Sequence, residues 1–180
     1  MKPFKIPKSS WKTISIDSIN FVLSEAKDYL DYTIKESDKI TSRAYSIVLL
    51  LFAILSGTIG YTFNKVSHSD FSKIILLNFC LSFVMIFLLF HLGRLVFPRK
   101  LMVKGRLPRK IALKEFLLTP ELSKEENYLS FIIQEVENTQ VKIDYNLTCN
   151  KKRQQRLKNI MIAIAILFPL YLIIAGFTAL

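Results

Sequence analysis

Three uninterrupted apolar runs constrain the fold of this chain more than any other feature. They cover residues 44–63, 74–97 and 159–180. A helix of about 20 apolar residues, rising 1.5 Å per residue, spans the roughly 30 Å hydrocarbon core of a bilayer. A buried helix of a soluble protein would carry polar residues every few positions. The runs therefore predict an all-α integral membrane protein with three transmembrane helices, the first two of which form a hairpin.

The polar residues between the runs divide the rest of the chain. Residues 1–43 are predicted to form a basic arm and an amphipathic helix, and residues 98–158 a basic segment followed by a second long helix. Apolar residues recur at helical spacing in both helices, and no breaker separates either from its span. We therefore expect a continuous helix over about 18–63 and another from about 124 into the third span.

Local signals predict where these elements begin and what lies before them. Ser18 is the predicted cap of the first helix. The second helix begins either at Thr119-Pro120 or at the S-x-x-E motif at 123–126, which is a capping box. Two prolines in residues 1–14 argue against a helix there. Gly and Pro residues break up the basic segment, which leaves room for a short strand at 101–103 and a turn of helix at 111–117.

The placement of positive charge predicts the orientation in the membrane. The formal net charge is +11, and residues 94–158 hold 15 Lys and Arg against 7 Asp and Glu. Much of this positive charge lies next to the ends of the second and third spans. Since Lys and Arg near span ends favour the cytoplasmic side, we expect the N-terminus and residues 98–158 inside and the C-terminus outside. The helical extensions and the irregular insertion are then cytosolic.

The chain lacks the residues that common catalytic and metal sites require. It contains two His and two Cys, no Gly-rich phosphate loop and no nucleophile elbow. Lone His and Cys residues without ligand spacing do not indicate a metal site. We therefore expect a protein that is not an enzyme, with no catalytic residues, no metal and no cofactor.

The second span contains polar side chains that need a partner or contact with water. Asn78 and Ser82 share one helical face, which Met85 continues. Asn is costly in hydrocarbon unless it is hydrogen-bonded or solvated. This face could hold helices together or line an aqueous pore, and the sequence leaves both interpretations open.

The basic segment is a candidate anion-binding site. Seven basic residues in 99–114 are accompanied by a single nearby acid, Glu115. Such a cluster could bind lipid headgroups beside the membrane or the phosphates of a nucleotide or oligonucleotide. The candidate phosphate ligands, with two lysines from the basic arm, are Lys100, Lys104, Arg106, Arg109, Lys110, Lys8 and Lys12. Trp11 or Tyr128 could stack on a base, although the arm could equally lie on lipid or in solvent.

Two stretches resemble small membrane effectors of nucleotide-signalled bacterial antiphage systems, the Pycsar and SLATT-type effectors. The first is EAKDYLDYTIKESDKITSRAYSIVLLLFAIL, which enters the first span. The second is IDYNLTCNKKRQQRLKNIMIAIAIL, with Asn146, Lys152 and Arg156 ahead of the third span. The layout is most similar to that of the Hailong membrane effectors.

The resemblance implies an oligomeric ion channel, a tetramer by analogy, in the bacterial inner membrane. In the Hailong family a cytosolic crown binds single-stranded oligodeoxyadenylate made by a partner nucleotidyltransferase, and loss of this DNA opens the pore and causes abortive infection. The chain lacks the separate cyclic-nucleotide-binding domain that many such effectors carry. We therefore expect the ligand site in the 98–150 segment itself. The alternative is a membrane scaffold or assembly subunit whose basic collar binds anionic lipid headgroups.

Overall fold

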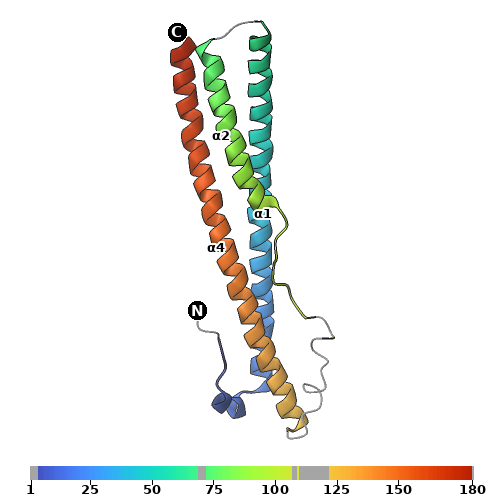
Figure 1. Cartoon of the computed structure of the whole chain (residues 1–180). Coiled ribbons are helices and arrows are strands. Elements are labelled where there is room, and N and C mark those ends of the chain that lie inside the picture. The colour runs from blue at the N-terminus through green and yellow to red at the C-terminus, as the bar shows by residue number, and fades with distance from the viewer. Residues whose placement is uncertain (1–3, 69–71, 107–108, 110–121, 180) are drawn as a thin grey trace. The chain divides into compact units, whose positions relative to one another are not determined.

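A computed structural model describes residues 4–68, 72–106, 109 and 122–179, and every regular element within these ranges is helical. A short 3₁₀ helix, η1 (Lys8–Thr13), precedes three long α-helices. The α-helices are labelled in Figure 1: α1 (Ile16–Ser67), α2 (Lys73–Val96) and α4 (Lys124–Ala179). All three α-helices are long and apolar enough to cross a membrane. The all-helical fold with three candidate spans is confirmed.

The two predicted long helices are continuous, but one predicted cap is wrong. The α1 helix begins before Ser18, because the Ser15 hydroxyl caps it by accepting a hydrogen bond from the Ser18 N–H at 3.1 Å. The predicted capping box of α4 is present. The Ser123 hydroxyl accepts from the Glu126 N–H (3.2 Å), and the Glu126 carboxylate accepts from the Ser123 N–H (2.9 Å).

Two further local predictions differ from the structure. Residues 101–103 do not form a strand, because they make no ladder with another extended segment in the described chain. The arm, predicted to be non-helical, contains η1, whose first turn is closed by a hydrogen bond from the Ser10 N–H to the Pro7 carbonyl (3.0 Å). Proline is tolerated at a helix start because no N–H is needed there. The predicted turn of helix at 111–117 lies outside the described residues.

The chain divides into two compact units that differ from the predicted parts. The span unit contains residues 38–99 and 151–180, and the extension unit contains residues 1–37 and 100–150. The α1 and α4 helices each contribute to both units.

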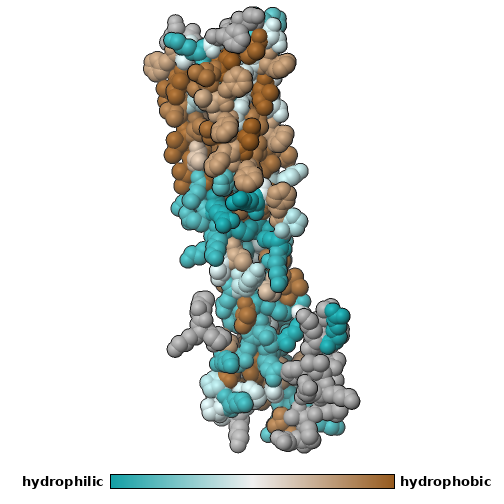
Figure 2. Space-filling model, in the orientation of Figure 1, coloured by the Kyte–Doolittle hydropathy of each residue, from teal (hydrophilic) through white to brown (hydrophobic). Residues whose placement is uncertain are grey.

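In the span unit, apolar side chains of α1, α2 and α4 pack together. Leu51, Met85 and Leu92 are fully buried in this core. Large apolar side chains such as Phe83, which is 76% exposed, cover the outside. Figure 2 shows the resulting hydrophobic surface over the apolar parts of the three helices. An apolar exterior matches lipid, whose tails solvate such side chains as well as a protein core does.

The extension unit has a smaller apolar core. Ile19 of α1 packs with Ile132, Ile133 and Val136 of α4, and Trp11 of η1 packs against this group. The arm is thereby held on the helix pair.

Candidate functional site

The basic segment that follows α2 lies against both α1 and α4 in the extension unit. We call residues 100–106 the linker segment. It connects to the C-terminal end of α2 through only a few residues of chain, Phe97–Arg99. Any ligand that moves this segment therefore acts close to the end of a candidate transmembrane helix.

A buried asparagine fixes the backbone of the linker segment. The Asn146 carbonyl oxygen accepts a hydrogen bond from the Met102 N–H (3.1 Å), and its amide nitrogen donates to the Met102 carbonyl (2.9 Å). The same nitrogen donates to the Thr33 hydroxyl of α1 (3.1 Å). Asn146 and Thr33 are both 0% exposed. One side chain thus joins three segments, and it pairs both backbone groups of the half-buried Met102.

The neighbouring turns of α1 and α4 extend this polar contact. Asn150 donates from its amide nitrogen to the Thr33 carbonyl (2.8 Å), and the Thr33 hydroxyl donates to the Leu30 carbonyl (2.7 Å). We call Asn146, Asn150 and Thr33 the asparagine clasp. Asparagine side chains make such bridges because each has both a donor and an acceptor group.

Ion pairs hold the rest of the linker segment on the two helices. Lys104 pairs with Asp31 and, at 3.6 Å, with Asp28, both on α1. Arg106 pairs with Glu135 of α4 at 2.9 Å. The hydrogen bond to Asp31 is the main cause that raises the pKa of Lys104 above its ordinary value of 10.5. Two predicted phosphate ligands are therefore already bound to carboxylates.

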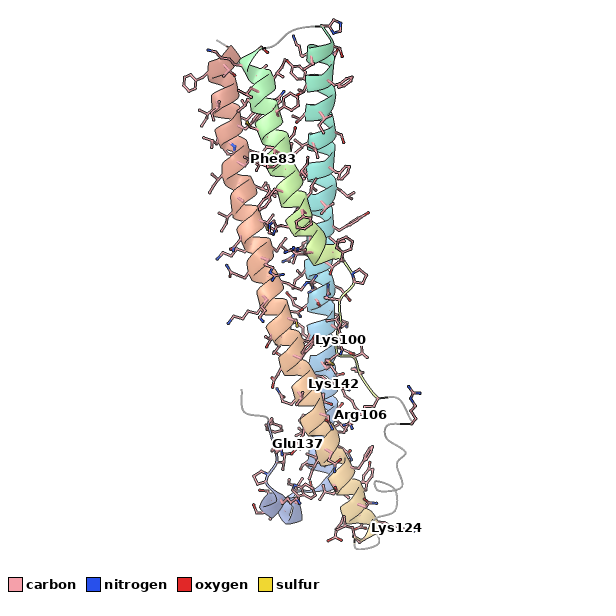
Figure 3. All side chains as sticks on the ribbon, viewed as in Figure 1. Phe83, Lys100, Arg106, Lys124, Glu137 and Lys142 are labelled. Carbon is pink, nitrogen blue, oxygen red and sulfur yellow. The ribbon has the colours of Figure 1, made fainter. Side chains whose placement is uncertain are left out.

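Gly105 lets the two flanking cations reach different helices. Its φ of 71° lies in the left-handed region, which glycine adopts without strain. Its carbonyl accepts a hydrogen bond from the Lys142 ammonium of α4 at 2.8 Å (Figure 3). This turn sends Lys104 to α1 and Arg106 to α4.

The other predicted phosphate ligands are less constrained or lie outside the described chain. Lys100 and Arg109 are exposed, and within the described residues neither has an acidic partner. Lys110 and the side chain of Lys12 lie outside the described part of the structure. The linker segment thus offers both paired and unpaired cations.

The basic arm folds back onto the extension unit. The Ile6 N–H donates to the Glu137 carboxylate at 2.7 Å, and the Trp11 indole N–H donates to the Ile6 carbonyl at 3.3 Å. Trp11 and Lys8 line a cavity of about 490 Å³. Two carboxylates, Glu125 and Glu126, share this cavity and would repel a phosphate there.

The two predicted base-stacking residues differ in exposure. Trp11 is half-buried by its packing, whereas Tyr128 is 51% exposed. Stacking by either residue stays a prediction, and the open face of Tyr128 is the more accessible one.

The predicted pore-lining residues are buried or half-buried within the span unit. Asn78 is 2% exposed, and its side-chain oxygen accepts a hydrogen bond from the Tyr171 hydroxyl at 2.7 Å. Met85 is fully buried and Ser82 half-buried. This geometry corresponds to the interpretation in which the polar face holds helices together. Pore lining by these residues would require α2 and α4 to separate, and it stays a prediction.

A second polar cluster ties the three helices together within the span unit. Arg153 of α4, 9% exposed, donates to the Leu95 carbonyl at the end of α2 (2.6 Å) and to the Thr41 hydroxyl of α1 (3.0 Å). Arg99 also donates to Thr41 (2.6 Å) and pairs with Asp38 at 3.6 Å. A carbonyl at the end of a helix has no intrahelical partner, so Arg153 supplies one.

Sequence reasoning missed most of the residues that hold the linker segment. Asp31 and Glu135 belong to helix faces rich in charge, and a solvated role is the common one for such residues. The available signal was polar residues on the otherwise apolar stripes: Thr33 on α1 and Asn146 on α4. In the described residues, no group of three or more His, Cys, Asp or Glu side chains could hold a metal ion.

Comparison of the chain with family models, with curated proteins and with solved structures gave no match. The function is therefore argued from the residues of this chain.

Proposed function

We propose that this protein is an oligomeric membrane channel of bacterial antiphage defence, gated by a nucleotide or single-stranded oligodeoxyadenylate. The ligand binds the basic residues of the linker segment, and a partner nucleotidyltransferase supplies it. Opening of the pore disrupts the membrane and causes abortive infection. The proposal follows the resemblance described above, with a tetramer as the analogous assembly.

The attachment of a basic linker segment directly after α2 is the observation that carries this proposal. A phosphate-binding surface at this position is connected to a candidate span by the chain itself. The segment is held at one point by the asparagine clasp and elsewhere by ion pairs of Lys104 and Arg106. A ligand that changes these ion pairs changes the restraint on the end of α2.

The ion pairs suggest how binding acts. Lys104 is 39% exposed, and solvent-exposed ion pairs contribute little to stability because water screens them. Phosphate oxygens form strong charge-assisted hydrogen bonds with Lys and Arg. A polyanion can therefore replace Asp31 and Glu135 as the partner of the linker segment, while Lys100 adds a cation that no described acid neutralises. The exchange removes the ion pairs that the segment makes with α1 and α4, while the asparagine clasp still holds it at Met102.

The surface of the span unit leaves room for neighbouring subunits. Only 17%, 28% and 6% of the most apolar windows of α1, α2 and α4 are buried within the protomer. A homo-oligomer would cover part of this surface, and the pore would form between subunits. Helix pairs in lipid associate through packing and small residues, and Ser56 and Gly60 of α1 provide one such position.

Salt dependence of binding tests the ligand site. We expect full-length protein in detergent to bind labelled oligodeoxyadenylate with an affinity that falls steeply as salt rises, in proportion to the phosphates contacted. Lys100→Gln should weaken binding and reduce the slope of log affinity against log salt by about 0.7 for a single strand. Lys124→Gln is the matched control, because Lys124 is exposed at the start of α4, away from the linker segment.

Ion flux in liposomes tests the gating. The proposal expects flux through reconstituted protein that changes on adding the oligonucleotide, and a smaller change in Lys100→Gln. An affinity independent of salt would refute the phosphate site. If the oligonucleotide binds but does not change the ion flux, the proposed gating is refuted and the proposed binding site is not.

The burial of Asn78 and Met85 favours a second candidate, a membrane scaffold without a pore. In this case the basic segment binds anionic lipid headgroups, and the polar face of α2 only joins helices. If the protein is a scaffold, we expect no ion flux in liposomes. We also expect a clean protein absorbance ratio at 260 and 280 nm after purification, whereas bound oligonucleotide would raise the ratio.

A further inference from the structure

A groove in the span unit combines two cations with an apolar floor. It lies between α1 and α4, has a volume of about 450 Å³, and is lined by Arg43 of α1 and Lys158 of α4. Its remaining lining includes Leu157, Met161, Ile162 and Ala165 of α4. None of these residues belongs to the linker segment or to the predicted collar.

The two cations stand where the charged and apolar parts of their helices meet. Arg43 directly precedes Ala44, the first residue of the first apolar run, and Lys158 lies just before the third run. Both side chains are exposed, and neither has an acidic partner among the described residues. Two unneutralised cations on separate helices can bind one phosphate group between them.

The floor of the groove provides the second half of a lipid site. Met161 and Ile162 are 53% and 48% exposed, and they continue the groove along the apolar part of α4. An acyl chain can cover these apolar side chains without burying any polar group. Its contacts with them replace the contacts that other lipid tails would make. Basic pockets between helices at the membrane surface are typical binding sites for anionic headgroups.

We propose that this groove binds an anionic phospholipid, with its phosphate between Arg43 and Lys158 and one acyl chain along Met161 and Ile162. Charge complementarity and the direct continuation into the apolar surface argue for this occupant. An oligonucleotide would match the cations but would leave the apolar floor uncovered. The proposal does not depend on channel activity.

Lipid binding to full-length protein tests the proposal. Native mass spectrometry or thermal stabilisation in detergent would compare phosphatidylglycerol with phosphatidylcholine. We expect preferential binding of phosphatidylglycerol, and roughly tenfold or greater weakening in the double variant Arg43→Gln/Lys158→Gln. The matched control is Lys39→Gln/Lys152→Gln, which removes the same charges from the same two helices outside the groove.

A second variant probes the floor without changing the charge. Ala165→Trp should fill the groove and weaken phosphatidylglycerol binding, and this result keeps the test decisive if the double variant fails to fold. Equal weakening in the groove and control variants would overturn the proposal. So would stabilisation by inorganic phosphate alone, competition by oligodeoxyadenylate, or a changed oligomeric state of Ala165→Trp at constant lipid, which would make the groove an interface between copies.

Discussion

The extension unit and the span unit hold their parts together with different interactions. In the extension unit a small apolar core is supplemented by the asparagine clasp and by the ion pairs of Lys104 and Arg106. In the span unit apolar packing dominates, and polar contacts are concentrated at Arg153 and at the Asn78–Tyr171 hydrogen bond.

This difference separates the contacts that a ligand can replace from those that it cannot. Solvated ion pairs can change partners at little cost, so the linker segment suits the binding of an anion. A buried hydrogen bond has no competing water, and its loss leaves unpaired groups that cost about 1–3 kcal/mol each. In the linker segment, a residue held by buried hydrogen bonds, Met102, therefore lies close to residues whose ion pairs can be replaced, Lys104 and Arg106.

The asparagine clasp gives the largest expected effect. Asn146→Leu leaves the Met102 N–H and carbonyl without their partner, so we expect a loss of roughly 3 kcal/mol in the extension unit. At about 2–4 °C per kcal/mol for a chain of this length, the unfolding midpoint should fall by about 6–12 °C. Trp11 is the only tryptophan and reports on this unit through its fluorescence. Asn138→Leu is the control, since among the described residues the Asn138 side chain bonds only to Gln134 of its own helix. Equal midpoints for the two variants would contradict the role of the clasp.

Arg153 tests the span unit in the same way. Arg153→Met removes hydrogen bonds to Leu95 and Thr41, and we expect a loss of roughly 2 kcal/mol. Arg153→Lys should not restore the stability, because a lysine lacks the planar fork of donors. The measurement is thermal unfolding followed by circular dichroism in detergent. Arg156→Met on the exposed side of α4 should leave the midpoint unchanged.

The turn at Gly105 should have a smaller effect. Gly105→Ala forces an L-residue into a positive φ, which costs about 1–2 kcal/mol and loosens the linker segment. Hydrogen exchange at residues 101–106 should rise. Gly57→Ala is the matched control, because Gly57 is a helical residue and an added Cβ there would contact no other atom. Slow exchange retained in Gly105→Ala would show that the turn tolerates other residues.

The Asn78–Tyr171 hydrogen bond should have the smallest effect. Hydrogen bonds between helices in membranes average about 0.6 kcal/mol, so Tyr171→Phe should lower stability only slightly. Tyr61→Phe, at an exposed position of α1, is the comparison. If Tyr171→Phe changed flux in liposomes far more than stability, Asn78 would have a role in the pore beyond joining helices.

The periodicity and length of the apolar runs were sufficient to predict the three long helices of this fold, but not η1. Uninterrupted stretches before two spans predicted that α1 and α4 are continuous, and the capping box at Ser123 predicted where α4 begins. The cap of α1 was missed because Ser15 and Ser18 are both residue types that cap helices. Only the backbone geometry shows that Ser15 is the cap.

The contacts of the linker segment could not be predicted in the same way. They join residues far apart in the chain, as in the pairing of Arg106 with Glu135, and surface charge patterns admit many such pairings. The burial of Asn78 is a similar case. Helical spacing places Asn78 on one face of α2 but does not show whether that face contacts another helix, lipid or water. Lys104 was predicted as a phosphate ligand, and its acidic partners on α1 were not foreseen.

The burial of Asn146 also bears on how the protein is produced. Asn146, Leu147 and Thr148 form an acceptor sequence for N-linked glycans. The amide nitrogen that would carry the sugar is hydrogen-bonded to Thr33 and Met102, and the side chain is 0% exposed. A glycan at this position is incompatible with the folded chain. Glycosylation during expression in a eukaryotic host would therefore mark protein whose residues 98–158 reached the lumen, against the orientation expected from the charges, before its extension unit folded.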